Sequence, residues 1–205
     1  QRCDEFSMFL SNSINLVLQN QQLNCLKQNL LRANKELANL SELDAMTELY
    51  NRRGFYKYFT RMLSETKRRY AVLVSVDMNQ LKHINDTYGH AEGDFAICTL
   101  AHGVKAICGT EAVCARFGGD EFVMLFPAGM ENRIEEIAEA ILQKIAEAGI
   151  ANEHSVVQPN LTISQGYACF VPEGTESGAR LIEHADKALY YVKRNSRNAY
   201  YIIRE

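Results

Sequence analysis

The chain has 205 residues, of which 47% are hydrophobic, and a formal net charge of -3 at pH 7. This length and apolar content favour one α/β domain with an appendage and exclude a wholly disordered chain. A protein that wraps duplex phosphates carries a basic surplus, which this chain lacks, so we expect no nucleic-acid polymer as partner.

The six cysteines form no Cys-x-x-Cys pair, which indicates reduced thiols and a cytoplasmic domain. No apolar run approaches the roughly 18 residues that span a bilayer, so this piece is expected to be soluble and to have no membrane segment. Because the sequence begins at Gln1 and not at methionine, we expect a longer parent protein whose upstream part holds a sensory domain or a membrane anchor.

Residues 1–43 are predicted to form a coiled-coil signalling helix. Large apolar residues recur at seven-residue spacing, at Phe9, Leu16, Leu23, Leu30 and Leu37. More than three such heptads favour parallel pairing with a second copy, which would make the protein a homodimer. The alternative is a single helix folded back on the globular domain, which is expected to comprise residues 44–205.

The globular part interleaves helices and strands. A lead-in segment is followed by an amphipathic helix ending near residue 68, and the later elements are a strand at 70–76, a helix at 95–107, a helix at 131–148, a strand at 161–170, a helix at 178–195 and a strand at 199–203. Because one strand pair is a hairpin, this order predicts an α+β sandwich, with a mixed sheet, over a doubly wound parallel fold.

The hairpin is marked by Gly118-Gly119 between two apolar runs. Glycine tolerates positive φ and lets a ligand approach the backbone, so we expect the two glycines at the bend. Asp120 and Glu121 follow, and on a strand their carboxylates would point to opposite sides, with one facing a site. By turn chemistry alone, an ordinary hairpin is an equally good interpretation.

Asp77 ends the apolar strand at 70–76, where a side chain is held rigidly beside an open loop. If Asp77 and Asp120 lie at adjacent strand ends, their carboxylates face one cleft and can hold magnesium together with substrate phosphates. Without the glycine turn, Asp77 would be interpreted as a strand-capping acid.

Residues 77–94 are predicted to form a polar loop that recognises a ligand. Asn85 offers donors and an acceptor, and Asp94 at a helix start can accept two N–H groups, the pattern of a guanine edge. Taken singly, Asn85 is better interpreted as a turn residue and Asp94 as an N-cap, and their presence in one loop favours ligand recognition.

Cations suited to phosphate lie at Lys193 and Arg197, four residues apart and on one face if the helix continues that far. Lys82 is a third candidate. The ordinary alternatives are a solvated basic helix end and a surface lysine.

Four ordered motifs, at residues 44–53, 77–94, 118–122 and 185–190, closely resemble the GGDEF family of diguanylate cyclases. The resemblance covers roughly residues 41 to 205. It implies a palm-like sandwich of a mixed, mainly antiparallel sheet flanked by helices, as in class III nucleotidyl cyclases.

The resemblance also implies a reaction, the condensation of two GTP into cyclic di-GMP with release of two pyrophosphates, each subunit of a dimer supplying half of the active site. Asp77, the backbone carbonyl of Met78, and Asp120 would ligate metal, with two Mg²⁺ per active site and Mn²⁺ as an alternative. The catalytic residues would be Asp120, Lys82 and Glu121. Guanine would be bound by Asn85 and Asp94. The phosphates would be bound by Gly119, Lys82, Lys193 and Arg197.

The sequence also departs from the family pattern. Gly109 and Ala112 occupy the positions of an Arg-x-x-Asp product-binding motif, so no product-inhibition site is expected. Asn79 replaces a frequent second acid. Two other functions are consistent with the same residues: an inactive GTP- or cyclic di-GMP-binding receptor, and a coiled-coil scaffold.

Overall fold

A computed structural model describes residues 16, 18–32, 41–65, 71–110, 112–127, 129–153, 155, 157–171 and 177–204. The chain divides into two units, Gln1–Ser41 and Glu42–Glu205. In the first, residues 18–32 are helical, and Leu16, Leu23 and Leu30 are exposed. The heptad positions Phe9 and Leu37 lie outside the described residues, and pairing through this helix stays a prediction. No helix in the described ranges has the length and apolarity that crossing a membrane requires.

The second unit is built on one six-stranded sheet. The strands are β1 (Tyr50–Asn51), β2 (Ala71–Asn79), β3 (Val113–Gly118), β4 (Glu121–Phe126), β5 (Thr162–Phe170) and β6 (Tyr200–Arg204). Their spatial order is β1-β3-β4-β2-β5-β6. The outer pairs β1·β3 and β5·β6 are parallel and the three inner pairs antiparallel. The predicted mixed, mainly antiparallel α+β fold is thus confirmed.

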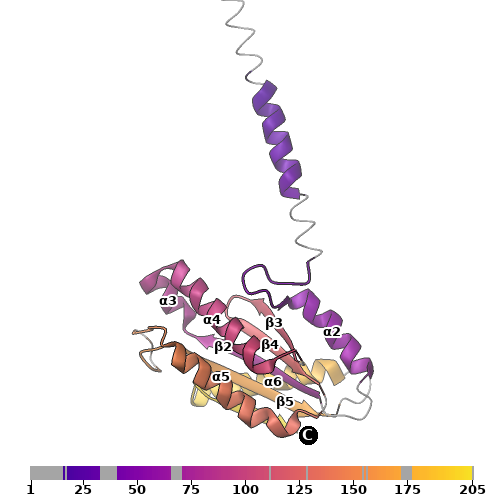
Figure 1. The fold of residues 1–205 in the computed structure, drawn as a ribbon, viewed down its shortest axis with the longest axis vertical. Coiled ribbons are helices and arrows are strands. Elements are labelled where there is room, and N and C mark those ends of the chain that lie inside the picture. Colours follow the sequence, from indigo (N-terminus) through magenta and orange to yellow (C-terminus); the bar gives the residue numbers. More distant parts are fainter. Residues whose placement is uncertain are drawn as a thin grey trace, which may run out of the picture. The chain divides into compact units, whose positions relative to one another are not determined.

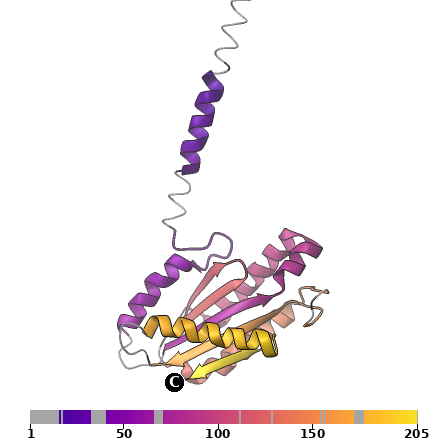
Figure 2. The same cartoon turned by 180° about the vertical axis from the view of Figure 1, so that it is seen from behind.

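Helices cover both faces of this sheet (Figures 1 and 2). They are α2 (Arg52–Glu65), α3 (Leu81–Tyr88), α4 (His90–Cys108), α5 (Ile134–Ala148), which follows a short 3-10 turn at Glu131–Arg133, and α6 (Ser177–Asn195). One core cluster joins the sheet to α3, α4 and α5, and a second joins it to α2 and α6.

The alternation of side chains along β2 decides what faces α6. Val74, Val76 and Met78 are fully buried in the core with α3, α4 and α5. Since successive strand residues point to opposite faces, Ser75 and Asp77 point to the α6 side. The polar positions of a largely apolar strand are therefore gathered on one face.

The polar loop predicted for residues 77–94 is wrong in its secondary structure. β2 continues to Asn79, and α3 and α4 occupy most of the remainder. The two helices are separated by Gly89, whose φ of 91 lies in the region that favours glycine. Asp94 is the fifth residue of α4 and not its N-cap, because the helix begins at His90.

The bend of the β3–β4 hairpin lies one residue later than predicted. The register shifts between Arg116 and Gly118, so Gly118 pairs with Glu121 and the turn consists of Gly119 and Asp120. A bulge of this kind adds one unpaired residue to a strand. Asp120 therefore lies in the turn, and the expectation that it alternates with Glu121 along a strand is wrong.

Gly166 in β5 lets α6 lie against the sheet at unusually short range. A Cβ built on Gly166 would lie 2.1 Å from the backbone nitrogen of Leu189 and 2.3 Å from the carbonyl oxygen of Ala185. No side chain fits there unless the helix moves away. The position of α6, and of every side chain on it, thus depends on this glycine.

Gly166→Ala should lower the free energy of unfolding by about 1–3 kcal/mol, the usual cost of overpacking a close contact. Urea denaturation followed by circular dichroism measures it. The matched control is Gly103→Ala within α4, where the new Cβ meets only the Lys144 side chain, at 3.2 Å. This control should be neutral or stabilising by up to about 1 kcal/mol. Equal stability of the two variants would contradict the close approach of α6.

Candidate active site

Three acids gather where β2 meets the β3–β4 turn. Asp77 and Glu121 are register partners on adjacent antiparallel strands, and such partners project from the same face. The Met78 N–H donates to the Asp120 carbonyl oxygen at 3.3 Å, which brings the turn against β2. The turn that bears Asp120 therefore lies beside Asp77, and Glu121 belongs to the same group. That the carboxylates of Asp77 and Asp120 face one cleft stays a prediction.

Asp77 already has a cationic partner in α6. The Lys193 Nζ lies 2.6 Å from Asp77 Oδ2, where the carboxylate side chain is only 11% exposed. Burial raises the pKa of Asp77, the hydrogen bond and charge of Lys193 lower it, and the charges of Asp120 and Glu121 raise it again. The net pKa lies above the ordinary value because burial, the largest effect, disfavours the ionised form and the Lys193 ammonium offsets only part of it.

A second polar contact joins the same strand and helix. Ser75 Oγ donates to Asp186 Oδ1 at 2.9 Å. Ser75 and Asp77 are two residues apart on a strand, and Asp186 and Lys193 are seven apart on a helix, so each pair lies on one face of its element. Sequence analysis missed this match, although the two spacings could have indicated it.

A cavity of about 350 Å³ borders these charged groups, between α2, α6 and the hairpin. Its polar lining includes Arg52, Glu121, Asp186 and Lys193. The remaining lining residues are Tyr56, Ser75, Phe117, Phe122, Val123, Ile182, Leu189 and Tyr190. The volume lies at the lower end of the range usual for small-molecule sites, so Glu121 and Lys193 border space that a ligand can enter.

The candidate guanine residues lie on α3 and α4. Asn85 packs against Gly93, because a Cβ at Gly93 would come within 1.8 Å of Asn85 Oδ1. Asp94, the next residue, is exposed. The structure therefore brings Asn85 and Asp94 close together, as expected, through contact between two helices. Lys82 is exposed on α3, and no contact joins it to the acids.

Arg197 and Lys193 were predicted to share a helix face if the helix continued to Arg197, and it does not. α6 ends at Asn195, and Arg197 follows with φ 45 in the left-handed region. Its backbone N–H donates to the Val192 carbonyl at 2.8 Å, and its Nε donates to the Lys193 carbonyl at 3.4 Å. Arg197 thus folds back on the end of α6 and stays near Lys193 by capping it.

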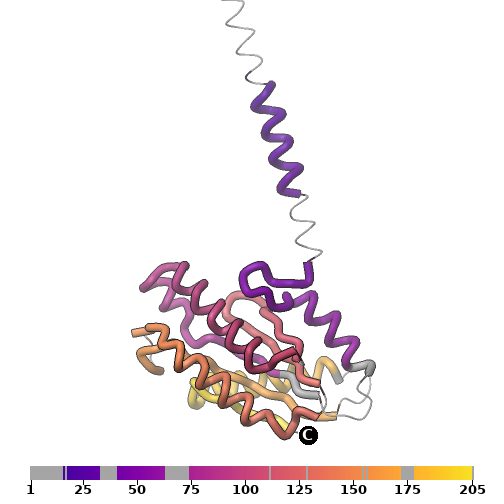
Figure 3. Tube along the Cα trace, viewed as in Figure 1, coloured from indigo at the N-terminus to yellow at the C-terminus, as the bar shows by residue number. Residues whose placement is uncertain are grey.

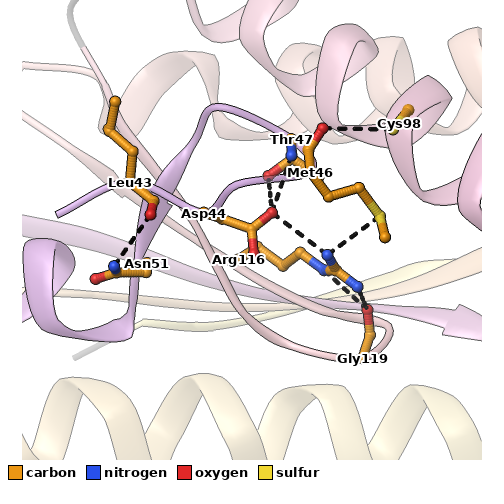
Figure 4. A network of polar contacts seen from close by, with 8 residues as sticks. All are labelled: Leu43, Asp44, Met46, Thr47, Asn51, Cys98, Arg116 and Gly119. Atoms are coloured by element: carbon orange, nitrogen blue, oxygen red, sulfur yellow. Dashed lines mark hydrogen bonds and ion pairs between the residues drawn. The ribbon is translucent and has the colours of Figure 1, made fainter. Parts of the chain in front are cut away.

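Arg116 joins the glycine turn to the segment before α2 (Figure 4). The backbone course of both segments can be followed in Figure 3. Its Nε and Nη2 donate to the Gly119 carbonyl at 3.0 and 2.9 Å, and its Nη1 lies 3.3 Å from Asp44 Oδ1. The same oxygen accepts from the N–H and hydroxyl of Thr47 at 2.9 and 2.7 Å. The guanidinium is 10% exposed and fixes the turn beside Asp120.

Asn79 has a structural environment. It is buried, its Nδ2 donates to Thr162 Oγ1 at 3.0 Å, and its Oδ1 accepts from Ser164 Oγ at 2.9 Å. Both of its polar atoms are thus used in binding β2 to β5. An amide suits this position because it can donate as well as accept, whereas an ionised acid can only accept.

Gly109 and Ala112 line a different cavity, of about 200 Å³. Its other lining residues are Leu43, Glu48, Leu49, Tyr50, Lys105 and Cys114. Glu48 and Lys105 are the charged groups of this lining, and neither occupies the expected motif positions. That the chain lacks a product-inhibition site stays a prediction.

The residues that could hold a metal fit magnesium better than a soft metal. Within the ranges that the structure describes, no three or more His, Cys, Asp or Glu side chains form a metal-binding cluster. Magnesium needs few protein ligands, since phosphate oxygens and water complete its octahedron. The Lys193 ammonium at Asp77 shows that a cation is stable at this carboxylate.

The family follows from comparison with known sequences. The sequence profile "Diguanylate cyclase, GGDEF domain" matches residues 41–199. The chain therefore belongs to the GGDEF domain family, as the motifs had indicated.

Individual relatives agree with this assignment. "Diguanylate cyclase DgcM" of Escherichia coli K12 is 34% identical over 169 residues, covering 82% of this chain and 40% of that protein. "Diguanylate cyclase A" of Treponema denticola is 31% identical over 170 residues, covering 80% of this chain and 45% of that protein. The chain thus spans less than half of these curated relatives.

Solved structures share the fold. The GGDEF domain of TpbB (YfiN) from Pseudomonas aeruginosa has a TM-score of 0.68 and 30% identity, over 78% of this chain and 93% of that one. The coiled coil and GGDEF domain of DgcB from Caulobacter crescentus, in complex with c-di-GMP, has a TM-score of 0.66 and 26% identity, over 95% of this chain and 100% of that one.

The Asp44 contact predicts a dependence of stability on pH. Burial raises the pKa of Asp44, but its hydrogen bonds from Thr47 and the charge of Arg116 outweigh burial and hold the pKa below 3.8. A lowered folded-state pKa stabilises the protein above the unfolded value, and this contribution is lost as pH falls through the folded value. Asp44→Asn should therefore cost about 1 kcal/mol at pH 7 and little near pH 2.

Denaturant unfolding at several pH values measures this difference. The control Glu48→Gln removes an exposed acid from the same segment and should show no comparable loss. A cost of Asp44→Asn that stays constant from pH 7 to pH 2 would rule out the ionised contact with Arg116.

Proposed function

We propose that this chain catalyses the condensation of two GTP into cyclic di-GMP. The observation that carries the proposal is the group of acids at Asp77, Asp120 and Glu121, set beside an α6 lysine and a ligand-sized cavity. In each half-reaction a 3′-hydroxyl releases its proton to solvent and its oxygen forms a bond to the α-phosphorus of the other GTP. The bond from that phosphorus to the β-phosphate oxygen breaks, and pyrophosphate leaves.

The guanine base is assigned to Asn85 and Asp94. The carboxylate of Asp94 can accept from the two N–H groups on the guanine edge, and the Asn85 amide can donate to an acceptor of the ring. Gly93 holds Asn85 in place by leaving room for its amide. The close spacing of the two polar groups supports this role.

The triphosphate is assigned to Lys82, Lys193, Arg197 and the backbone at Gly119. Gly119 has no Cβ and a φ of 52, so phosphate oxygens can approach its backbone closely. The cations offset negative charge that spreads over the transferring phosphoryl group. Arg197 supports this function from the cap of α6, with its guanidinium near the Lys193 carbonyl.

Asp77, Asp120 and the Met78 carbonyl would hold magnesium, two ions per site or manganese in their place. When bound, the metal supplies Lewis-acid stabilisation of phosphate charge. Glu121 adds negative charge on the same face as Asp77. Arg116 of β3 holds the turn that bears Asp120 through the Gly119 carbonyl, and the Met78 N–H holds the same turn against β2.

Two subunits are required, because each GTP must meet the α-phosphate of the other. The leucines at positions 16, 23 and 30 are exposed in the single chain, and burying such a stripe against a second copy is favourable. Homodimerisation through the N-terminal helix is therefore part of the proposal.

Incubation with GTP and magnesium, followed by chromatography of the products, tests the reaction. Cyclic di-GMP and pyrophosphate are expected. Bound but unconverted GTP would indicate a receptor, and absence of binding would indicate a scaffold. Either result would overturn the proposed activity.

Asp120→Asn should reduce the rate by roughly a hundredfold or more, as expected when charge stabilisation of the transition state is lost. It should change the free energy of unfolding by no more than about 0.5 kcal/mol, because Asp120 lies in a turn and repels Asp77. The control Asp86→Asn, on the exposed side of α3, should retain activity. Full activity of Asp120→Asn would remove Asp120 from the mechanism.

Deletion of residues 1–40 should lower activity at dilute protein concentration, because pairing of the subunits becomes weaker. At high protein concentration the activity of the deletion variant should recover. The rate measured across a dilution series, together with sedimentation, tests this. An unchanged concentration dependence would show that another surface makes the dimer.

A further inference from the structure

The Lys193 ammonium contacts the carboxylate of Asp77, the residue to which metal binding is assigned above. It contacts Oδ2 at 2.6 Å, and the carboxylate side chain is 11% exposed, so little open space remains around these oxygens. A divalent ion on the same carboxylate would lie within a few ångströms of the ammonium. Two cations so close repel each other strongly, because a partly buried site screens charge poorly.

Lys193 has room to leave. Its side chain is 37% exposed, four methylene groups connect the ammonium to the helix, and it lines the cavity of about 350 Å³. Asp77 cannot follow, because β2 is hydrogen-bonded to β4 on one side and β5 on the other. The strand is therefore the fixed partner and the lysine the movable one.

We propose that Lys193 is an internal counter-ion that metal binding displaces from Asp77, so that its ammonium becomes available to phosphate only when the metal is present. Metal and nucleotide then bind cooperatively, since each removes a cost that the other would meet alone. The inference rests on the proposed role of Asp77 as a metal ligand and goes beyond it by coupling metal binding to phosphate binding through one residue.

Manganese binding without nucleotide tests the displacement directly. Lys193→Met should bind Mn²⁺ about fivefold more tightly than the wild type, measured by electron paramagnetic resonance of free Mn²⁺. We expect the low end of the usual coupling range because the lysine is more than a third exposed. Unchanged or weaker Mn²⁺ binding would overturn the proposal.

The matched control is Lys187→Met, which removes one positive charge from the same helix. Lys187 pairs with Glu183 at 2.7 Å, and both side chains are 59% exposed. The Lys187→Met variant should bind Mn²⁺ with an affinity within about twofold of the wild type, since exposed charges are well screened. If both variants gain equally, the effect is one of net charge and the proposal fails.

The cooperativity has its own measurement. Titration with a non-hydrolysable GTP analogue, with and without Mn²⁺, gives the factor by which Mn²⁺ strengthens binding of the analogue. This coupling factor should be about fivefold smaller in Lys193→Met than in the wild type. An equal coupling in both proteins would overturn the link to phosphate.

A measurement on the wild type avoids any folding defect of the variant. The side-chain ¹⁵Nζ resonance of Lys193, assigned by its absence in Lys193→Arg, should show an ion-paired ammonium without metal and should shift on addition of Mg²⁺. A resonance unchanged at saturating Mg²⁺ would show that the lysine stays on Asp77. Displacement without GTP turnover would support the counter-ion and reject the cyclase activity, so the two failures are distinguishable.

Discussion

The contact between the Asp77 carboxylate and the Lys193 ammonium is the interaction on which the arrangement of the site depends. It joins a central strand to the last helix of the domain, at 2.6 Å. The strand is held by ladders on both sides, and Gly166 allows the helix to approach. A buried acid beside other acids needs a positive partner, and packing of the fold supplies one.

Helices α3 and α4 pack on one face of the sheet and helix α6 on the other. Asn85 and Asp94 come from helices α3 and α4, whereas the acids of β2 and the hairpin meet α6 on the opposite face. The two sets are connected through the end of β2, where Met78 is buried in one core and Asp77 contacts the other helix layer. Under the proposed function this division lets separate rigid elements hold the base and most of the triphosphate, with Lys82 as the proposed phosphate contact from α3.

The two glycines of the turn permit several backbone conformations, but the contacts around the turn restrict it to one. Gly119 and its neighbour adopt φ values that other residues rarely take, and an unsupported turn of this kind would sample several conformations. Arg116 prevents this by donating twice to the Gly119 carbonyl while it contacts Asp44. The position of Asp120 therefore depends on a segment more than seventy residues earlier in the chain.

The amino-acid sequence alone determined the features that depend on local pattern: the mixed sheet, the hairpin with its glycines, and the family. Tertiary structure decided the rest. The helices within residues 77–94 escaped prediction because their polar surface suggested a loop, whereas their burial of Leu81 and Ile84 depends on the sheet. The conformation of Arg197 at the end of α6 and the ion pair between Asp77 and Lys193 were not predicted. Both depend on how segments pack in space, and periodicity along a chain carries no information about that packing.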